Sequence, residues 1–266
     1  MGGSMPLSRA LEDRYKSLGG TIHYKKRVEK ILTDGSRAYG IRLDDGMEYH
    51  SSKVISGADG YSTIFKMLEG KFTDDRIRHM YEKWIPFYPL IFIGLGVKRK
   101  FDDVNLSVSG FSFPLKEQVQ IGDRIVERLP VHLYHHDPSM APEGKTALII
   151  MLETDYEYWK NLYENREEYD LKKQEIANTV IALLEQRFPG ISSQVEMTDV
   201  ATPMTLERYT GNWKGSFEGW QLTPENSFVM MKPLSQMLPV LNNFYMCGQG
   251  VEPGGGLPTG VMSARR

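Results

Sequence analysis

The chain has 266 residues and a mass of 30.4 kDa, a length that corresponds to one or two domains. Hydrophobic residues make up 41% and charged residues 25% of the sequence, so the chain can fold around a core and is not disordered. The net charge of −2, with both signs interleaved, argues against a nucleic-acid partner, and the single Cys247 excludes an intrachain disulfide or a cysteine zinc cluster.

The first quarter of the sequence predicts a helix and then a β-meander. Apolar residues recur at steps of three and four from Pro6 to Leu18, and Gly19-Gly20 follows, which is typical of an amphipathic helix with a glycine stop. Short β-type runs lie at 21–24, 28–32, 38–43, 47–49 and 53–56, with Asp-Gly pairs at 34–35 and 45–46. Because Asp-Gly is a strong hairpin signal, we expect one antiparallel sheet over 21–56 with an uncovered apolar face around Val28 and Ile41. Helices are expected at 61–69 and 73–83.

The middle of the chain predicts a sheet with helices packed on one face. Runs rich in β-branched and aromatic residues lie at 90–97, 107–113, 124–132, 146–152 and 195–202. Region 156–188 mixes apolar and charged residues at helical spacing and ends at Pro189-Gly190, so it predicts one long or two shorter helices. We expect an apolar cavity beside the other face, lined by Met and aromatic side chains.

No segment of the sequence predicts a membrane span. The longest uncharged run, 87–97, contains Pro89, Gly94 and Gly96 and is far shorter than the roughly 20 residues that a spanning helix needs. The N-terminus shows no signal-peptide pattern. We therefore expect a cytoplasmic protein, and peripheral contact with a membrane stays open.

Several catalytic patterns are missing from the sequence. It has no intact G-x-G-x-x-G, P-loop, G-x-S-x-G or H-E-x-x-H motif. Strand alternation separates His132 from His135, so no metal site is expected. The acidic run at 164–170 is assigned to a solvated helix face. Tyr209, Trp213, Phe217 and Trp220 could line a pocket or belong to a core.

The C-terminal tail carries the clearest ligand signal. A buried strand at 243–247 runs into Gly248-Gln249-Gly250, and the glycine-rich segment 253–260 follows before the start of a helix. A backbone track without Cβ atoms lets a flat or charged ligand approach closely, and free N–H groups of a first helical turn favour negative charge. The tail therefore predicts a binding site.

These segments resemble the phytoene desaturase and carotenoid isomerase branch of FAD-dependent oxidoreductases. The matching motifs are Gly2-Gly3-Ser4, Gly40-Ile41-x-Leu43-x-Asp45-Gly46, Val54-Ile55-Ser56-x-Ala58-Asp59, Arg208-Tyr209-Thr210-Gly211-Asn212-Trp213-x-Gly215-Ser216-x-x-Gly219-Trp220 and the tail from Met246 to Gly260. The resemblance covers nearly the whole chain in order. Members of this branch begin with a βαβ unit carrying G-x-G-x-x-G, which this sequence lacks, so we expect a fragment of a longer parent.

The resemblance implies an α+β fold of the α/β family with two functional domains. Residues 1–59 would form part of the FAD-binding domain as a helix and a β-meander, and 60–239 would form the substrate domain, with a mixed or antiparallel sheet flanked by helices. Residues 240–266 would return to the FAD-binding domain as a strand, a glycine loop and a helix.

The resemblance also implies where FAD would bind. Val28 would offer its backbone to the adenine edge, and Gly248 and Gln249 would lie along the ribityl chain or pyrophosphate. The isoalloxazine would meet the glycine track and the helix start, formed by Gly254, Gly255, Gly256, Pro258, Thr259, Gly260 and Val261. No catalytic acid or base is assigned, because flavin enzymes of this kind need mainly an apolar tunnel and orientation.

Two functions from different classes stay open. The first is a fragment of an FAD-dependent oxidoreductase that moves a hydride between flavin and a long apolar polyprenoid or related lipid. The second is a non-catalytic module that binds an apolar ligand or a partner without flavin. The expected partners are a long apolar substrate and the N-terminal half of the FAD domain, and self-association stays open. Desaturation, saturation and isomerisation are not distinguished, and we expect this chain alone to be inactive and not to retain FAD.

Overall fold

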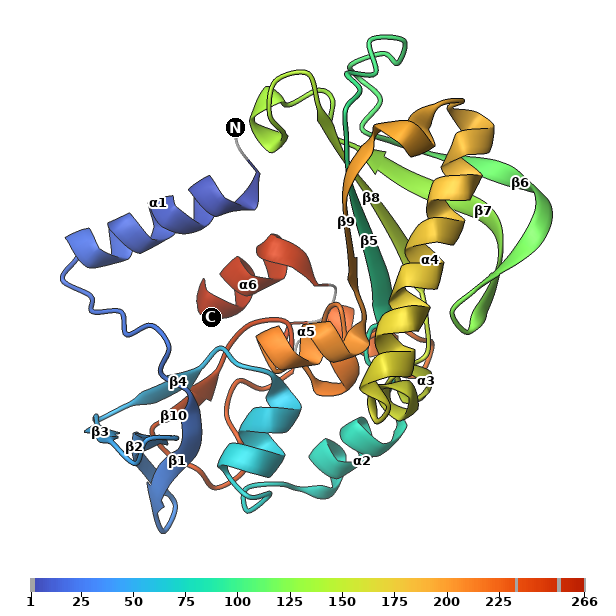
Figure 1. Ribbon diagram of the computed structural model, residues 1–266. Coiled ribbons are helices and arrows are strands. Elements are labelled where there is room, and N and C mark those ends of the chain that lie inside the picture. Colours follow the sequence, from blue (N-terminus) through green and yellow to red (C-terminus); the bar gives the residue numbers. More distant parts are fainter. Residues whose placement is uncertain (1–2, 233, 253–254, 266) are drawn as a thin grey trace. The chain divides into compact units, whose positions relative to one another are not determined.

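The computed structural model describes residues 3–232, 234–252 and 255–265. The chain divides into two compact units (Figure 1). Unit 1 contains the described residues up to 22 together with 90–204, and unit 2 contains 23–89 together with the described residues from 205 onward.

Unit 1 is built on a five-stranded antiparallel sheet with strand order β6-β7-β8-β5-β9. Its strands are β5 (Leu90–Val97), β6 (Gly110–Ile121), β7 (Arg124–Leu133), β8 (Thr146–Glu153) and β9 (Val195–Ala201). All five predicted strands are confirmed, although β6 is longer than expected and carries an irregularity after Pro114. The short helices η2 (Pro138–Met140) and η3 (Ile191–Gln194) lie in its connections.

Helices α3 (Tyr156–Tyr163) and α4 (Arg166–Arg187) cover one face of this sheet (Figure 1). The odd-numbered residues of β5 from Ile91 to Val97 are buried against them, and the even-numbered residues face the other way. Ile176, Val180 and Leu184 supply the helical side of this core. The expected packing of the 156–188 helices on one face is confirmed, and strand alternation assigns each residue of the sheet to a face.

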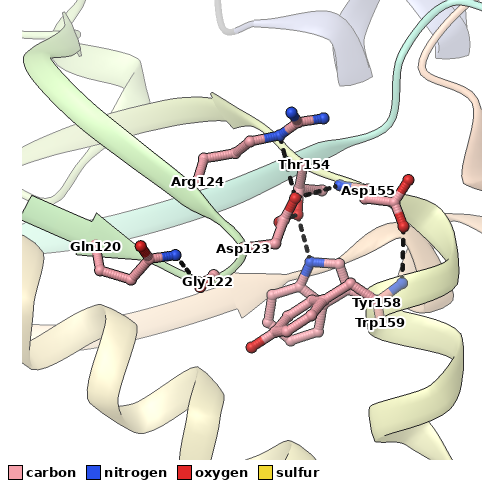
Figure 2. A network of polar contacts seen from close by, with 8 residues as sticks. All are labelled: Gln120, Gly122, Asp123, Arg124, Thr154, Asp155, Tyr158 and Trp159. Atoms are coloured by element: carbon pink, nitrogen blue, oxygen red, sulfur yellow. Dashed lines mark hydrogen bonds and ion pairs between the residues drawn. The ribbon is translucent and has the colours of Figure 1, made fainter.

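A polar network joins the turn of the β6–β7 hairpin to the start of α3 (Figure 2). The Asp123 carboxylate accepts hydrogen bonds from the Thr154 hydroxyl and from the Asp155 N–H, the latter at 3.1 Å. The Trp159 indole N–H donates to the same Thr154 hydroxyl at 2.7 Å, and Arg124 pairs with Asp123 at 3.1 Å. Asp155 caps α3 by accepting the Tyr158 N–H at 2.9 Å. Every member therefore has a partner, which is what a buried polar cluster requires.

The predicted N-terminal helix is present as α1 (Ser4–Ser17). It ends where the two glycines were expected to stop it, since Gly19 takes a φ of 86° and donates to the Lys16 carbonyl at 2.9 Å. No residue of α1 is buried.

Unit 2 begins with a three-stranded antiparallel sheet of β1 (Val28–Asp34), β2 (Arg37–Leu43) and β3 (Glu48–His50). Two details of the predicted meander are wrong. Residues 21–24 form no strand, and β4 (Val54–Ser56) leaves the meander and pairs in parallel with β10 (Phe244–Met246). The expected uncovered apolar face is also wrong for the most part, because Ile31 and Ala38 are buried and Ile41 packs against the core of unit 2.

The helices of unit 2 are η1 (Ser62–Met67), α2 (Asp75–Lys83), η4 (Trp213–Gly215), η5 (Ser227–Met230) and α6 (Gly256–Arg265), while α5 (Pro203–Thr210) runs across the division between the units. Of these, η1, α2, η4 and η5 supply residues to that core. The predicted helices at 61–69 and 73–83 are confirmed as η1 and α2, and Asp74 caps α2 by accepting the Ile77 N–H at 2.8 Å.

The compact units and the expected functional domains have different boundaries. The units divide at 22/23, 89/90 and 204/205, whereas the functional division was placed at 59/60 and 239/240. Compactness alone does not assign a unit to flavin or to substrate, so the functional division stays a prediction.

Candidate functional site

A pocket of about 270 Å³ lies in unit 2, where two parallel strands end. Residues 57–60 follow β4 and residues 247–250 follow β10, and both segments line the pocket. Ligands of open sheets with parallel strands bind at the carboxyl ends of the strands, because the loops there diverge and leave a crevice. We call this site the glycine-walled pocket. The remaining lining residues are Tyr81, Pro86, 212–213, 216, 218–220, Gly256 and Gly260.

Glycine makes the wall of this pocket thin at two positions. A Cβ atom on Gly260 would meet no atom within 4 Å, and one on Gly57 would meet only the Cys247 sulfur at 3.5 Å. Both glycines line the pocket, so side chains at these positions would take up room that a ligand can use. Glycine is needed at position 219 for a different reason, because a Cβ atom there would overlap the backbone of Gln249.

Helix α6 holds the glycine turn that follows β10. The Ser263 hydroxyl, on a residue that is 1% exposed, accepts the Gly248 N–H at 2.7 Å and donates to the Gly260 carbonyl at 2.8 Å. Gly248 has a φ of 93°, which a side chain would disfavour. The first turn of α6 presents backbone N–H groups without helical acceptors, which favours electron-rich oxygen atoms nearby.

Aromatic residues also line the pocket, namely Tyr81, Trp213 and Trp220. Tyr61 stacks on Trp213 with ring centroids 4.8 Å apart, and Tyr81 contacts Trp213 and Trp220 edge-on at 5.6 and 5.0 Å. Burial raises the pKa of the Tyr81 hydroxyl and the nearby Asp59 carboxylate adds to the rise, so Tyr81 stays protonated. The Trp220 indole N–H donates to the Gly250 carbonyl at 3.3 Å.

Two carboxylates line the pocket and differ in their surroundings. Asp59 accepts hydrogen bonds from the Ser62 N–H at 2.8 Å and the Trp213 N–H at 3.1 Å, so it joins η1 to the aromatic segment. Glu218 packs over Gly255, where a Cβ atom would overlap its carboxylate. Gly255 also has a φ of 64°. The role of Gly255 is therefore to make room for Glu218 and to allow this turn.

The structure brings together only some of the predicted site residues. Gly248, Gln249, Gly256 and Gly260 line the glycine-walled pocket. Pro258 and Val261 are exposed on α6, Thr259 is buried and donates to the Gly256 carbonyl, and Val28 begins β1. Neither these four nor Gly255 is among the lining residues. The predicted Gly254 lies outside the described residues.

Sequence reasoning missed several residues of this pocket. Asp59, Gly60 and Tyr81 were given no site role, although Ala58-Asp59 stood in a recognised motif. The sequence does not decide between pocket and core for Trp213 and Trp220, and both line the pocket. Phe217 and Tyr209 are exposed instead. The available signal was the pair of strand-to-glycine transitions at 56–57 and 246–248, which the parallel pairing brings side by side.

An apolar groove of about 530 Å³ lies on the open face of the sheet in unit 1. Gly94 and Gly96 form part of its floor, and Ile149, Met140 and Met197 line its sides. The expected apolar cavity on this face is confirmed together with its Met lining. The expected aromatic lining is wrong, since Phe111 and Phe113 pack against the core and no aromatic residue lines the groove in the described part of the chain.

Among the described residues, no three His, Cys, Asp or Glu side chains are grouped so that they could hold a metal ion. No helix in the ranges that the structure describes combines the length and the apolar character needed to cross a bilayer.

Comparisons with known proteins define the class of this chain. The profile of the family described as flavin containing amine oxidoreductase matches residues 1–266. The prolycopene isomerase of Arabidopsis thaliana is 28% identical over 274 residues, covering 100% of this chain and 44% of the relative. A zeta-carotene-forming phytoene desaturase of Myxococcus xanthus is 26% identical over 293 residues, covering 99% of this chain and 50% of the relative. The chain thus spans about half the length of the curated relatives it matches.

Solved structures show the same fold. An oxidoreductase from Methanosarcina mazei superposes with a TM-score of 0.59 at 20% identity, over 97% of this chain and 52% of that one. A triple mutant of putrescine oxidase superposes with a TM-score of 0.58 at 12% identity, over 97% of this chain and 50% of that one.

The chain belongs to the flavin-containing amine oxidoreductase family. Within this family, the resemblance to phytoene desaturases and carotenoid isomerases is confirmed, and the expected α+β fold with it.

Proposed function

We propose that this chain forms part of an FAD-dependent oxidoreductase that moves a hydride between flavin and a long apolar polyprenoid, carotenoid-like or related lipid substrate. The observation that carries the proposal is the glycine-walled pocket at the carboxyl ends of β4 and β10. The relatives named above support the substrate class, since their names refer to prolycopene and phytoene.

The residues of the pocket fit the ring end of FAD. Gly57 and Gly260 leave the wall without Cβ atoms, so a flat ring could approach the backbone. The first turn of α6 would offer N–H groups to the electron-rich oxygens of the ring, and the aromatic residues would exclude water. When bound, FAD would supply the hydride acceptor or donor of the reaction.

Other residues would keep this site in shape. Ser263 fixes the Gly248 turn and Asp59 fixes the Trp213 segment, each through backbone N–H groups. Tyr81 stays neutral and adds a protonated hydroxyl to the wall. No residue is assigned as an acid or base.

Binding of the nucleotide end of FAD is expected to need residues outside this chain. Pyrophosphate binding in such enzymes depends on a βαβ unit with G-x-G-x-x-G, and this sequence lacks that motif. We therefore propose that the partner is a segment with this unit, and that the isolated chain is colourless and inactive. Co-expression with such a segment should give yellow protein.

A titration with lumiflavin, which is the ring without its nucleotide, tests the pocket in the chain as it is. The ring should bind weakly, and the neighbouring Tyr and Trp side chains should quench its fluorescence. Gly260→Val should lower this affinity by about tenfold or more, because the added methyl groups enter the ring's space. Ala264→Val places the same side chain at an exposed position of α6 and should leave the affinity unchanged.

A substitution at Gly255 would not test the ring site. A side chain there would clash with Glu218 and strain the turn whether or not a ring binds. Equal lumiflavin affinity in wild type and Gly260→Val would count against the ring site.

The second function, a binding module without flavin, has one observation in its favour. The apolar groove lies wholly within unit 1, so an apolar ligand could bind there without the pocket of unit 2. Saturable binding of an apolar ligand, combined with no flavin band after co-expression, would support this alternative.

A further inference from the structure

We propose that the apolar groove of unit 1 selects apolar chains that end in a hydrogen-bond donor, a hydroxyl or an ammonium group, and disfavours chains that end in a carboxylate. The selecting group is the carboxylate of Asp199. The inference rests on the proposed apolar substrate and adds the chemistry of its end group.

The floor of the groove is a trough along β5. Gly94 lies between Ile149 of β8 and Asp199 of β9, and Gly96 lies between Ala147 and Met197 in the same way. A Cβ atom on Gly94 would come no closer than 3.9 Å to any atom outside its chain neighbours, so the space above it is open. Apolar side chains flank this space, which suits a narrow hydrocarbon chain lying along the strand.

The alternation of β9 places Asp199 on this open face. Its neighbour Val200 is buried in the core beneath the sheet, so the Asp199 side chain points the other way, into the groove that it lines. The opposite residue, Gly94, has no side chain that could cover the carboxylate from β5. A chain that lies over Gly94 therefore passes beside the Asp199 carboxylate, within reach of a polar end group.

The charges around the groove leave this carboxylate without a counterion. Three charged residues line the groove, namely Lys145, Glu196 and Asp199. Lys145 and Glu196 form an ion pair with each other. No hydrogen bond or ion pair from a side chain in the described ranges reaches the Asp199 carboxylate. The lining of the groove therefore carries a net negative charge, which comes from the Asp199 carboxylate. This carboxylate attracts hydrogen-bond donors and cations and repels anions.

Three retinoids with the same polyene chain and different end groups test this selection. All-trans-retinol has a hydroxyl, retinylamine an ammonium group and retinoic acid a carboxylate. Each is titrated into the purified chain at pH 7.5, followed by quenching of tryptophan fluorescence and checked by ultrafiltration. Retinol and retinylamine should bind about fivefold more tightly than retinoic acid, the upper end of the range for an exposed charge such as Asp199.

Two variants locate the effect at Asp199. Asp199→Asn should bring the three affinities to within about twofold of one another, since the amide keeps the shape and removes the charge. The control Asp102→Asn removes one carboxylate from an exposed loop of the same unit and should keep the wild-type ratio. Gly94→Leu should abolish binding of all three, with folding checked by circular dichroism.

The outcomes separate this inference from the flavin proposal. Absence of saturable retinol binding to the wild type, or an unchanged ratio in Asp199→Asn, overturns the inference. Lumiflavin binding, measured on the same preparations, reports on the pocket of unit 2 alone. If lumiflavin binds and the retinoid ratio does not respond to Asp199→Asn, the flavin site stands and the end-group selection falls.

Discussion

Replacing Thr154 with valine should destabilise unit 1 strongly without changing its shape. The Thr154 hydroxyl donates to Asp123 and accepts the indole N–H of Trp159, and Thr154 is 2% exposed. Valine has nearly the same volume, so the change removes the hydroxyl and leaves the packing.

The expected size follows from the groups that lose a partner (Figure 2). The Trp159 side chain is fully buried, so an indole N–H without an acceptor costs about 1–3 kcal/mol. Asp123 loses a charge-assisted hydrogen bond worth about 1.5–3 kcal/mol, but it keeps the Asp155 N–H and the Arg124 ion pair. We therefore expect a loss of about 3 kcal/mol in the free energy of unfolding, or about 10 °C in Tm.

Urea unfolding followed by circular dichroism at 222 nm measures this loss without relying on Trp159 emission. Thr198→Val, at an exposed site on β9, is the matched control and should change stability by less than about 0.5 kcal/mol. In a Trp159→Phe background the Thr154→Val cost should fall by about 1 kcal/mol, because no indole N–H is left without an acceptor. A free energy of unfolding of Thr154→Val within about 0.5 kcal/mol of wild type would refute the network as a stabilising element.

Three further predictions concern unit 2. Ser263→Ala removes the acceptor of the Gly248 N–H and should lower the free energy of unfolding by about 1–2 kcal/mol, with weaker lumiflavin binding; unchanged values in both measurements would contradict the role assigned to Ser263. Val240 is β-branched, exposed and held at a φ of 54°, so Val240→Asn should raise stability by about 1 kcal/mol, and a lower urea midpoint would speak against strain at this residue. Lys30 and Lys71 lower the pKa of Glu69 from 4.5 to about 2. The ionised carboxylate therefore stabilises the fold fully above pH 4.5, and this stabilisation is lost as the pH falls toward 2. Glu69→Gln should therefore be less stable than wild type at pH 7, the difference should shrink between pH 4.5 and 2, and a constant difference in urea midpoints would contradict this explanation.

The sheet of unit 1 could be predicted from the sequence because its signals are local. Each of its strands is a β-branched or aromatic run, and β5 and β8 show their alternation directly in the burial of successive residues. The helical region 156–188 was equally clear, and Asn165 supplies the cap that divides it into α3 and α4.

The glycine-walled pocket was predictable only in part, because its two halves meet through a pairing between distant segments. Nothing local in Val54–Ser56 indicates that it pairs with Phe244–Met246 and not with β3. The glycine tail indicated a ligand, but it could not show that Gly255 accommodates Glu218, because that contact depends on how segment 216–220 returns to the tail. Trp213 and Trp220 stayed ambiguous for the same reason.

The parallel pairing of β4 with β10 has a consequence for the order in which the chain can fold during synthesis. Every strand of the unit 1 sheet lies between these two strands in the sequence, so a ribosome completes that sheet before it makes Phe244. Among the described strands β4 pairs only with β10, so until then its backbone groups lack this partner and are open to pairing with other chains. The loop that the pairing closes contains nearly 190 residues, but closure entropy grows only slowly with length, and prior folding of the sheet shortens the flexible part. The nascent chain is therefore most vulnerable to aggregation in the interval just before its last glycine-rich turn emerges.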